Sequence, residues 1–143
     1  MSADMSEYVA DRIAITDVMA TYAACVDDRD DAGYKALFTD DVEVVGMGPE
    51  PINGIEAWFD FWLAAVDKYS VTQHMLGPTL ATIDGDKAST RTDVQAHHYV
   101  KDDPKTTVTL WATYRTDMVR AGSSWKICRH ELVSRGLRRQ TDS

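Results

Sequence analysis

The stretch IAITDVMATYAACVDDRDDAGYKALFTDD, residues 13–41, decides how the rest of the chain must be arranged. Its apolar residues recur at the spacing of one buried helical face: Ile15, Val18, Met19, Tyr22, Cys25 and Val26. Asp27 directly follows the last of them, so we expect it at the helix end, at the edge of the apolar interior. A carboxylate in such a place loses hydration and requires a partner elsewhere in the chain.

Length and composition limit the classes of protein to consider. The chain has 143 residues and a formal net charge of −8, which predicts a single domain, residues 1–143, and argues against nucleic acid or an anionic membrane as partner. No apolar run suits a membrane span and the polar N-terminus does not resemble a signal peptide, so we expect a cytoplasmic protein. Cys25 and Cys128 lack redox or metal-motif spacing and are expected to be buried free thiols.

The predicted elements run from helices to strands. A helix ending near Val26 is followed by a short helix ending near Phe38, a valine-rich strand at 42–46 and a helix from Ile55 to about Lys68. The apolar period then changes to two, which predicts strands at 71–77, 80–83, 88–100, 106–119 and 125–133, and the polar tail GLRRQTDS is expected to be frayed. This order predicts an α+β fold in which one curved, mixed sheet wraps over three helices and encloses an apolar interior.

Histidines on two of the strands are the candidate partners of Asp27. Alternation in VTQHMLG places His74 on one face with Thr72. On the strand 88–100, strict alternation points His98 inward and His97 outward, although one bulge would exchange them. Because neighbouring residues cannot share a strand face, a histidine-rich metal site is not expected. A structural or surface histidine is the alternative at each position.

Five further side chains are expected to face the interior. On the last strand Trp125 looks inward and Arg129 is expected to follow it, where it would require a carboxylate from the protein or a ligand. Tyr114 lies on the apolar face of its strand, and a buried tyrosine with a paired hydroxyl is the structural alternative. Trp58 and Trp62 belong to the broad aromatic face of the third helix, which is more typical of a core than of a cofactor site.

Six short stretches, taken in order, resemble the SnoaL-like branch of the NTF2-like superfamily. They are Tyr22-x4-Asp27-Asp28-Arg29-Asp30, Leu37-Phe38-Thr39-Asp40-Asp41, Asn53-Gly54-Ile55-Glu56, Thr72-Gln73-His74, Asp84-Gly85-Asp86-x-Ala88 and Trp125-Lys126-Ile127-x-Arg129. Each is weak alone, but the ordered set covers nearly the whole chain and is specific for the fold. The resemblance implies a cone-shaped α+β barrel.

Within that group, scytalone dehydratase, bile-acid 7α-dehydratase and hexachlorocyclohexane dehydrochlorinase carry an Asp at the end of the first helix and a His on the strand after the third. Asp27 and His74 fall on those positions. Tyr22 resembles the active-site tyrosine of bile-acid dehydratase. His98 matches the second histidine of scytalone dehydratase in an alignment shifted by one residue, which leaves His97 as an alternative.

Two departures from scytalone dehydratase imply a different substrate. Val26 stands where that enzyme has a tyrosine just before its Asp. Ala112 and Tyr114 stand where it has polar serine and asparagine on a later strand.

The resemblance implies a dehydratase-type lyase that needs no cofactor. In that scheme Asp27 fixes the tautomer of His74, and His74 removes a proton from a carbon next to an activating group. A hydroxyl or halide then departs, helped by His98 or Tyr22 as proton donor, while Arg129 supports developing negative charge.

The expected ligand is a small, mostly apolar cyclic molecule, in contact with Tyr114, Trp58, Trp62 and His97. Isomerisation of a ketosteroid-like compound and polyketide cyclisation are alternatives on the same scaffold. A third alternative is a non-catalytic protein that binds a ligand or a partner, like the small subunits of ring-hydroxylating dioxygenases. We also expect a homodimer or homotrimer formed through the outer sheet face, with contributions from Thr107, Thr109, Trp111, Thr113 and Arg115.

Overall fold

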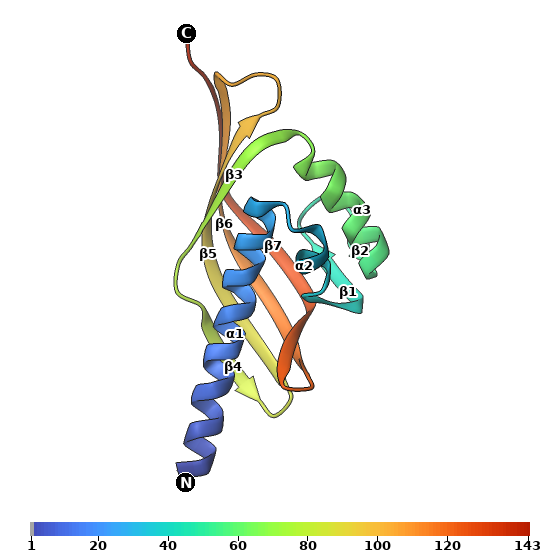
Figure 1. Ribbon diagram of the computed structural model, residues 1–143, viewed down its shortest axis with the longest axis vertical. Coiled ribbons are helices and arrows are strands. Elements are labelled where there is room, and N and C mark those ends of the chain that lie inside the picture. Colours follow the sequence, from blue (N-terminus) through green and yellow to red (C-terminus); the bar gives the residue numbers. More distant parts are fainter. Residues whose placement is uncertain (1) are drawn as a thin grey trace.

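The computed structural model describes residues 2–143 as one curved sheet with three helices on one side (Figure 1). The elements are α1 (Ser2–Asp28), α2 (Asp31–Lys35), β1 (Phe38–Val45), β2 (Ile52–Asn53), α3 (Ile55–Val66), β3 (Tyr69–Leu76), β4 (Leu80–Asp84), β5 (Lys87–Val100), β6 (Thr106–Ala121) and β7 (Ser124–Thr141). The predicted α+β fold, with its three helices and mixed sheet, is confirmed.

The sheet is mixed because one of its pairings is parallel. Its strands follow the order β2-β1-β7-β6-β5-β3, with β4 paired to the first part of β5. β1 runs parallel to β7, and the other pairs are antiparallel. Within residues 2–143 no pairing joins β2 to β3, so the curved sheet forms an open cone.

α1 closes the cone with the apolar stripe that the sequence predicts. Ile15, Met19 and Tyr22 are buried on it, and the helix packs against β3 and β7. The helix continues two residues beyond Val26, so Asp27 lies in its last turn. This position brings Asp27 to the inner side of β3.

The C-terminal tail differs from the prediction, because it is a strand and not a frayed end. β7 continues to Thr141, and Gly136–Thr141 pair with Thr106–Trp111 of β6. The long partner strand supplies backbone hydrogen bonds that the polar composition of the tail does not reveal. The short strand β2, paired with β1, was also not predicted.

An extra residue in β7 changes which side chains face the interior. Asp117 pairs with Arg129, but the next residue, Met118, pairs with Ile127, so Cys128 is inserted as a bulge. Ile127 before the bulge is fully buried, and after it His130, not Arg129, is fully buried. The prediction that Arg129 faces inward is therefore wrong.

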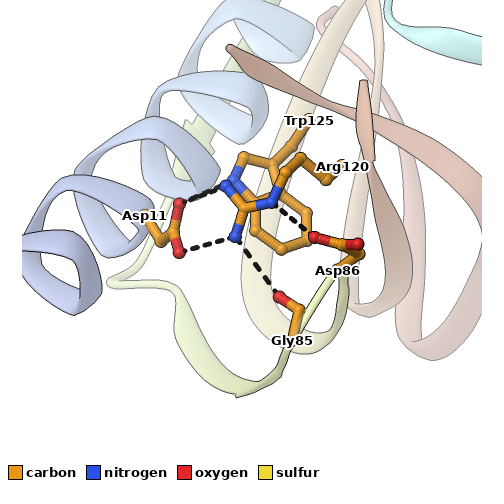
Figure 2. A network of polar contacts seen from close by, with 5 residues as sticks. All are labelled: Asp11, Gly85, Asp86, Arg120 and Trp125. Carbon is orange, nitrogen blue, oxygen red and sulfur yellow. Dashed lines mark hydrogen bonds and ion pairs between the residues drawn. The ribbon is translucent and has the colours of Figure 1, made fainter. Parts of the chain in front are cut away.

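A polar network fixes the N-terminal half of α1 to the sheet (Figure 2). The Arg120 guanidinium donates to both carboxylate oxygens of Asp11, at 2.8 and 2.9 Å, and its Nε donates to Asp86 at 2.8 Å. It also stacks on the ring of Trp125, whose indole N–H donates to Asp11 at 3.3 Å. The hydrogen bonds that Arg120 donates to Asp11 lower the pKa of this carboxyl group.

Candidate functional site

A cavity of about 140 Å³ lies between α1, α3 and the inner face of the sheet. Its walls are mostly apolar and aromatic, with a few polar side chains among them. The lining residues are Tyr22, Val26, Met47, Trp58, Phe61, Trp62, Ala65, Val66, Tyr69, Thr72, His74, Ala96, His98, Leu110, Tyr114 and Leu132. Such a pocket, with few convergent polar groups, is the usual form of a small-molecule site.

Asp27 and His74 form a hydrogen-bonded pair at this cavity. Oδ1 of Asp27 lies 2.8 Å from Nδ1 of His74, and Oδ2 accepts from the backbone N–H of His74 at 2.8 Å. Thr72 donates its hydroxyl to Oδ1 at 3.0 Å. The side chains of His74 and Asp27 are 8% and 20% exposed. The partner that the position of Asp27 requires is thus supplied by β3.

This geometry fixes the tautomer of His74. An ionised carboxylate only accepts hydrogen bonds, so Nδ1 of His74 carries the proton that Asp27 accepts. In the neutral ring Nε2 is then unprotonated and available as a base. The negative charge of Asp27 stabilises the ring once Nε2 has taken up a proton.

His98 is a second imidazole at the cavity, and its surroundings favour the neutral form of the ring. Its Nδ1 donates to the carbonyl of Val108 at 2.9 Å, and its ring meets that of His74 edge-on at 5.8 Å. Burial lowers the pKa of His98, the neighbouring His74 and His97 act in the same direction, and the bond to Val108 partly opposes them. His98 is therefore neutral at pH 7, with Nε2 as an acceptor.

Tyr22 and Tyr114 supply phenols to the cavity wall. Both are buried, and their ring centroids are 5.4 Å apart. Burial raises the pKa of each well above its usual value, so both keep their protons and can donate hydrogen bonds. Trp58 and Trp62, which were predicted to contact a ligand, also line the cavity.

The two other predicted site residues lie elsewhere. Nε of Arg129 binds Glu43 at 3.0 Å, away from the cavity, because of the bulge at Cys128. His97 points to the outer face, where its Nδ1 contacts the hydroxyl of Thr109 at 2.7 Å. The prediction that His97 binds the ligand is therefore wrong for this cavity.

His130 is the buried polar residue that the sequence did not single out. It is fully buried against Tyr22 and Tyr114, with ring centroids 5.1 and 4.7 Å away, and its Nδ1 contacts the hydroxyl of Thr116 at 2.9 Å. Burial lowers its pKa to about 3, so the ring is neutral. Strict alternation placed it outward, and only the bulge, which has no signature in the sequence, brings it inward.

Two further features concern metals and membranes. In the described part of the chain, no group of three or more His, Cys, Asp or Glu side chains is placed to hold a metal ion. Among residues 2–143, no helix combines the length and the apolarity needed to span a membrane.

Comparison with known proteins identifies relatives of the whole domain. The sequence profile of the SnoaL-like domain family matches residues 7–131. The uncharacterized protein Rv2910c of Mycobacterium tuberculosis is 27% identical over 122 residues, which cover 85% of this chain and 83% of that protein.

Solved structures share the fold at low sequence identity. A candidate scytalone dehydratase from Novosphingobium aromaticivorans superposes with a TM-score of 0.87 at 21% identity, over 97% of this chain and 93% of that one. The type 2 hexachlorocyclohexane dehydrochlorinase LinA gives a TM-score of 0.84 at 20% identity, over 95% and 93% of the two chains.

Proposed function

Because the chain belongs to the SnoaL-like family of the NTF2-like superfamily, and because Asp27 orients a histidine at its cavity, we propose that it is a dehydratase-type lyase. The contact between Asp27 and His74 carries this proposal. A carboxylate that holds an imidazole by Nδ1 leaves Nε2 as a general base. The two solved structures with this fold are named for elimination reactions, a dehydration and a dehydrochlorination.

The proposed reaction removes a proton and a leaving group from adjacent positions of a ring. His74 Nε2 takes the proton from a carbon next to an activating group, and the electrons of the broken C–H bond form a C=C bond. The bond to the leaving hydroxyl or halide breaks at the neighbouring carbon. The proton on His74 then passes to the departing hydroxide to give water, or to solvent when a halide leaves.

The neighbouring side chains have separate roles in this proposal. Tyr22 and Tyr114 keep their protons, so they donate hydrogen bonds to oxygen atoms where negative charge develops. Neutral His98 accepts a hydrogen bond and orients the ligand, because its low pKa makes it a poor proton donor at pH 7. Arg129 takes no part, since it is bound to Glu43 away from the cavity.

Cavity size and lining indicate the class of substrate. A cavity of about 140 Å³ is close to the ~150 Å³ that encloses one benzene ring in a protein core. Apolar walls favour a ring with few polar substituents. We therefore propose a single-ring, mostly apolar compound with one activating group.

The alternatives share part of this machinery. A ketosteroid-type isomerisation or a polyketide cyclisation would also begin with proton removal by His74, and product analysis separates them from elimination. A non-catalytic ligand-binding protein has no need for a base, and the short contact between Asp27 and His74 at a cavity argues against it.

Self-association through the outer sheet face is a further part of the proposal. Trp111 is partly exposed there, and Arg115 is exposed beside it on the same strand face. A homodimer or homotrimer would bury this side of β6. Light scattering of the wild-type protein and of Trp111→Glu tests it, and a wild-type monomer at micromolar concentration would contradict it.

The activity is tested with cyclic β-hydroxy ketones and chlorinated cyclohexanes. Enone absorbance or halide release reports elimination. Asp27→Asn and His74→Gln should each lower the rate by about 10²- to 10⁴-fold, the usual contribution of general acid–base catalysis. His97→Gln, on the outer face, is the matched control and should keep full activity. Equal rates in all three variants would refute the proposal.

A further inference from the structure

α1 carries a second, mostly apolar face, opposite the one that packs on the sheet. Its members recur every three or four residues and are all exposed: Met5, Val9, Ile13, Thr16, Ala20 and Ala24. The three large side chains Met5, Val9 and Ile13 are 62%, 47% and 59% exposed. This spacing makes one continuous stripe along the helix, which we call the outer α1 stripe.

No other element in the described part of the chain covers this stripe. Figure 1 shows α1 lying along the sheet, with its N-terminal end projecting past the strands. The contact between Asp11 and Arg120 holds the N-terminal half of α1 to the sheet. The stripe is therefore presented on a fixed helix, and a row of large exposed apolar side chains marks an interaction surface.

The side chains of the outer α1 stripe become smaller from its N-terminal to its C-terminal end. Its first half holds the large side chains of Met5, Val9 and Ile13, and its second half holds the small ones of Thr16, Ala20 and Ala24. A second copy of the same helix, laid antiparallel, brings the large half of each onto the small half of the other. Met5 then meets Ala24, Val9 meets Ala20 and Ile13 meets Thr16 of the other copy.

We propose that the outer α1 stripe binds the same stripe of a second copy, as an antiparallel helix pair about a two-fold axis. One self-complementary surface suffices for such a contact. At 1.5 Å per residue the stripe is about 30 Å long, and the small residues allow the usual helix separation of about 8–10 Å. This contact is separate from the outer sheet face and does not depend on the reaction catalysed.

Charge favours a second copy over a membrane surface as the occupant. Helices that lie on membranes carry Lys and Arg along the borders of their apolar face. The outer α1 stripe is bordered by Arg12 on one side and Asp17 on the other, in a chain of net charge −8. A foreign amphipathic helix is the remaining occupant, and the experiment separates it from a second copy.

The first test is the molecular mass by sedimentation velocity between about 1 and 200 μM, a range suited to a small helix-pair interface. The wild type should reach twice the monomer mass, or an even multiple if the outer sheet face also associates. Ala20→Glu, which places a charge against Val9 of the other copy, should weaken association at least 10-fold. Ala10→Glu is the matched control, because it makes the same change at an exposed position of α1 outside the stripe, on its Asp17 side.

A cross-link tests the antiparallel arrangement directly. Val9→Cys and Ala20→Cys proteins, mixed and mildly oxidised, should form a disulfide between the two variants, and wild type under the same oxidant should form none. Disulfides between two copies of the Val9→Cys protein would indicate parallel helices and overturn the proposal. An unchanged mass for Ala20→Glu, or an equal loss for Ala10→Glu, would also overturn it, as would complete dissociation by Trp111→Glu alone.

Discussion

The carboxylate of Asp27 accepts hydrogen bonds from two nitrogens of one residue, the backbone N–H and the ring Nδ1 of His74, each at 2.8 Å. The first bond fixes the strand and the second fixes the ring, so the position and the orientation of His74 depend on a single side chain. Thr72 occupies a further acceptor site of the same carboxylate. Asp27 is therefore both a structural link between α1 and β3 and the group that orients the ring of His74.

Asp27→Asn should change the tautomer of His74. The amide can present an N–H to Nδ1, so the ring proton should move to Nε2 in part of the population, which leaves the cavity side without a base. Nitrogen-15 chemical shifts of the ring report the two tautomers without any substrate. Thr72→Val, which removes only the hydroxyl donor, should leave the tautomer unchanged. An identical spectrum in Asp27→Asn would show that the two groups are not coupled.

Buried His130 should make stability depend on pH. Its folded pKa is about 3, whereas the unfolded value is about 6.5. Below pH 6.5 the unfolded chain binds a proton that the folded protein excludes, so stability falls as the pH is lowered from about 6.5 toward 3. The loss should reach about 2 kcal/mol at pH 5, and His98 should add to it in the same direction.

Urea unfolding at pH 7.5 and at pH 5 measures this effect. His130→Phe should show a smaller difference between the two pH values than wild type, whatever its absolute stability. His97→Gln should keep the wild-type difference. The interpretation fails if His130→Phe and wild type lose the same free energy.

The two carboxylates bound to Arg120 should differ in their contribution to stability. Asp11 is largely buried and accepts two bonds from the guanidinium and one from Trp125. Asp11→Asn should lower the free energy of unfolding by about 1–3 kcal/mol. Asp86, whose side chain is 82% exposed, should contribute below about 1 kcal/mol. Equal losses for Asp11→Asn and Asp86→Asn in urea unfolding would contradict this ranking.

The cavity should prefer one ring to two. Cyclohexanone at 100 times its dissociation constant should stabilise the protein by about 2.7 kcal/mol. 2-Decalone, with two fused rings, should give a smaller shift in melting temperature at equal concentration, because a cavity of about 140 Å³ does not enclose it. Ala96→Leu, which adds volume at the cavity wall, should reduce the effect of cyclohexanone. A larger shift with 2-decalone would show that the cavity expands.

The architecture was predictable because its signals are periodic. The buried stripe of α1 and the alternation of residues 87–96 in β5 each repeat over many residues, so their burial follows from the sequence alone. The contact of Asp27 with His74 was predictable for another reason. A carboxylate at the inner end of an apolar helix needs a donor, and His74 stands on an inward-facing position of the sheet.

The remaining parts depend on backbone pairing that single residues do not reveal. The tail forms a strand only because β6 is long enough to pair with it. Alternation could not place Arg129 and His130 correctly, because it assumes that no residue is inserted. The choice between His97 and His98, which the sequence left open, follows strict alternation because β5 carries no bulge before His98 in its pairing with β6.

The bulge at Cys128 decides which of two neighbouring side chains faces the interior. Arg129 and His130 are neighbours on one strand, so only one of them can face inward. Arg129 is permanently charged, whereas His130 is neutral. If Cys128 paired with Asp117 in a regular strand, Arg129 would take the position opposite Thr116 and would lie beside Tyr22 and Tyr114. The bulge at Cys128 therefore keeps a permanent positive charge out of the apolar interior.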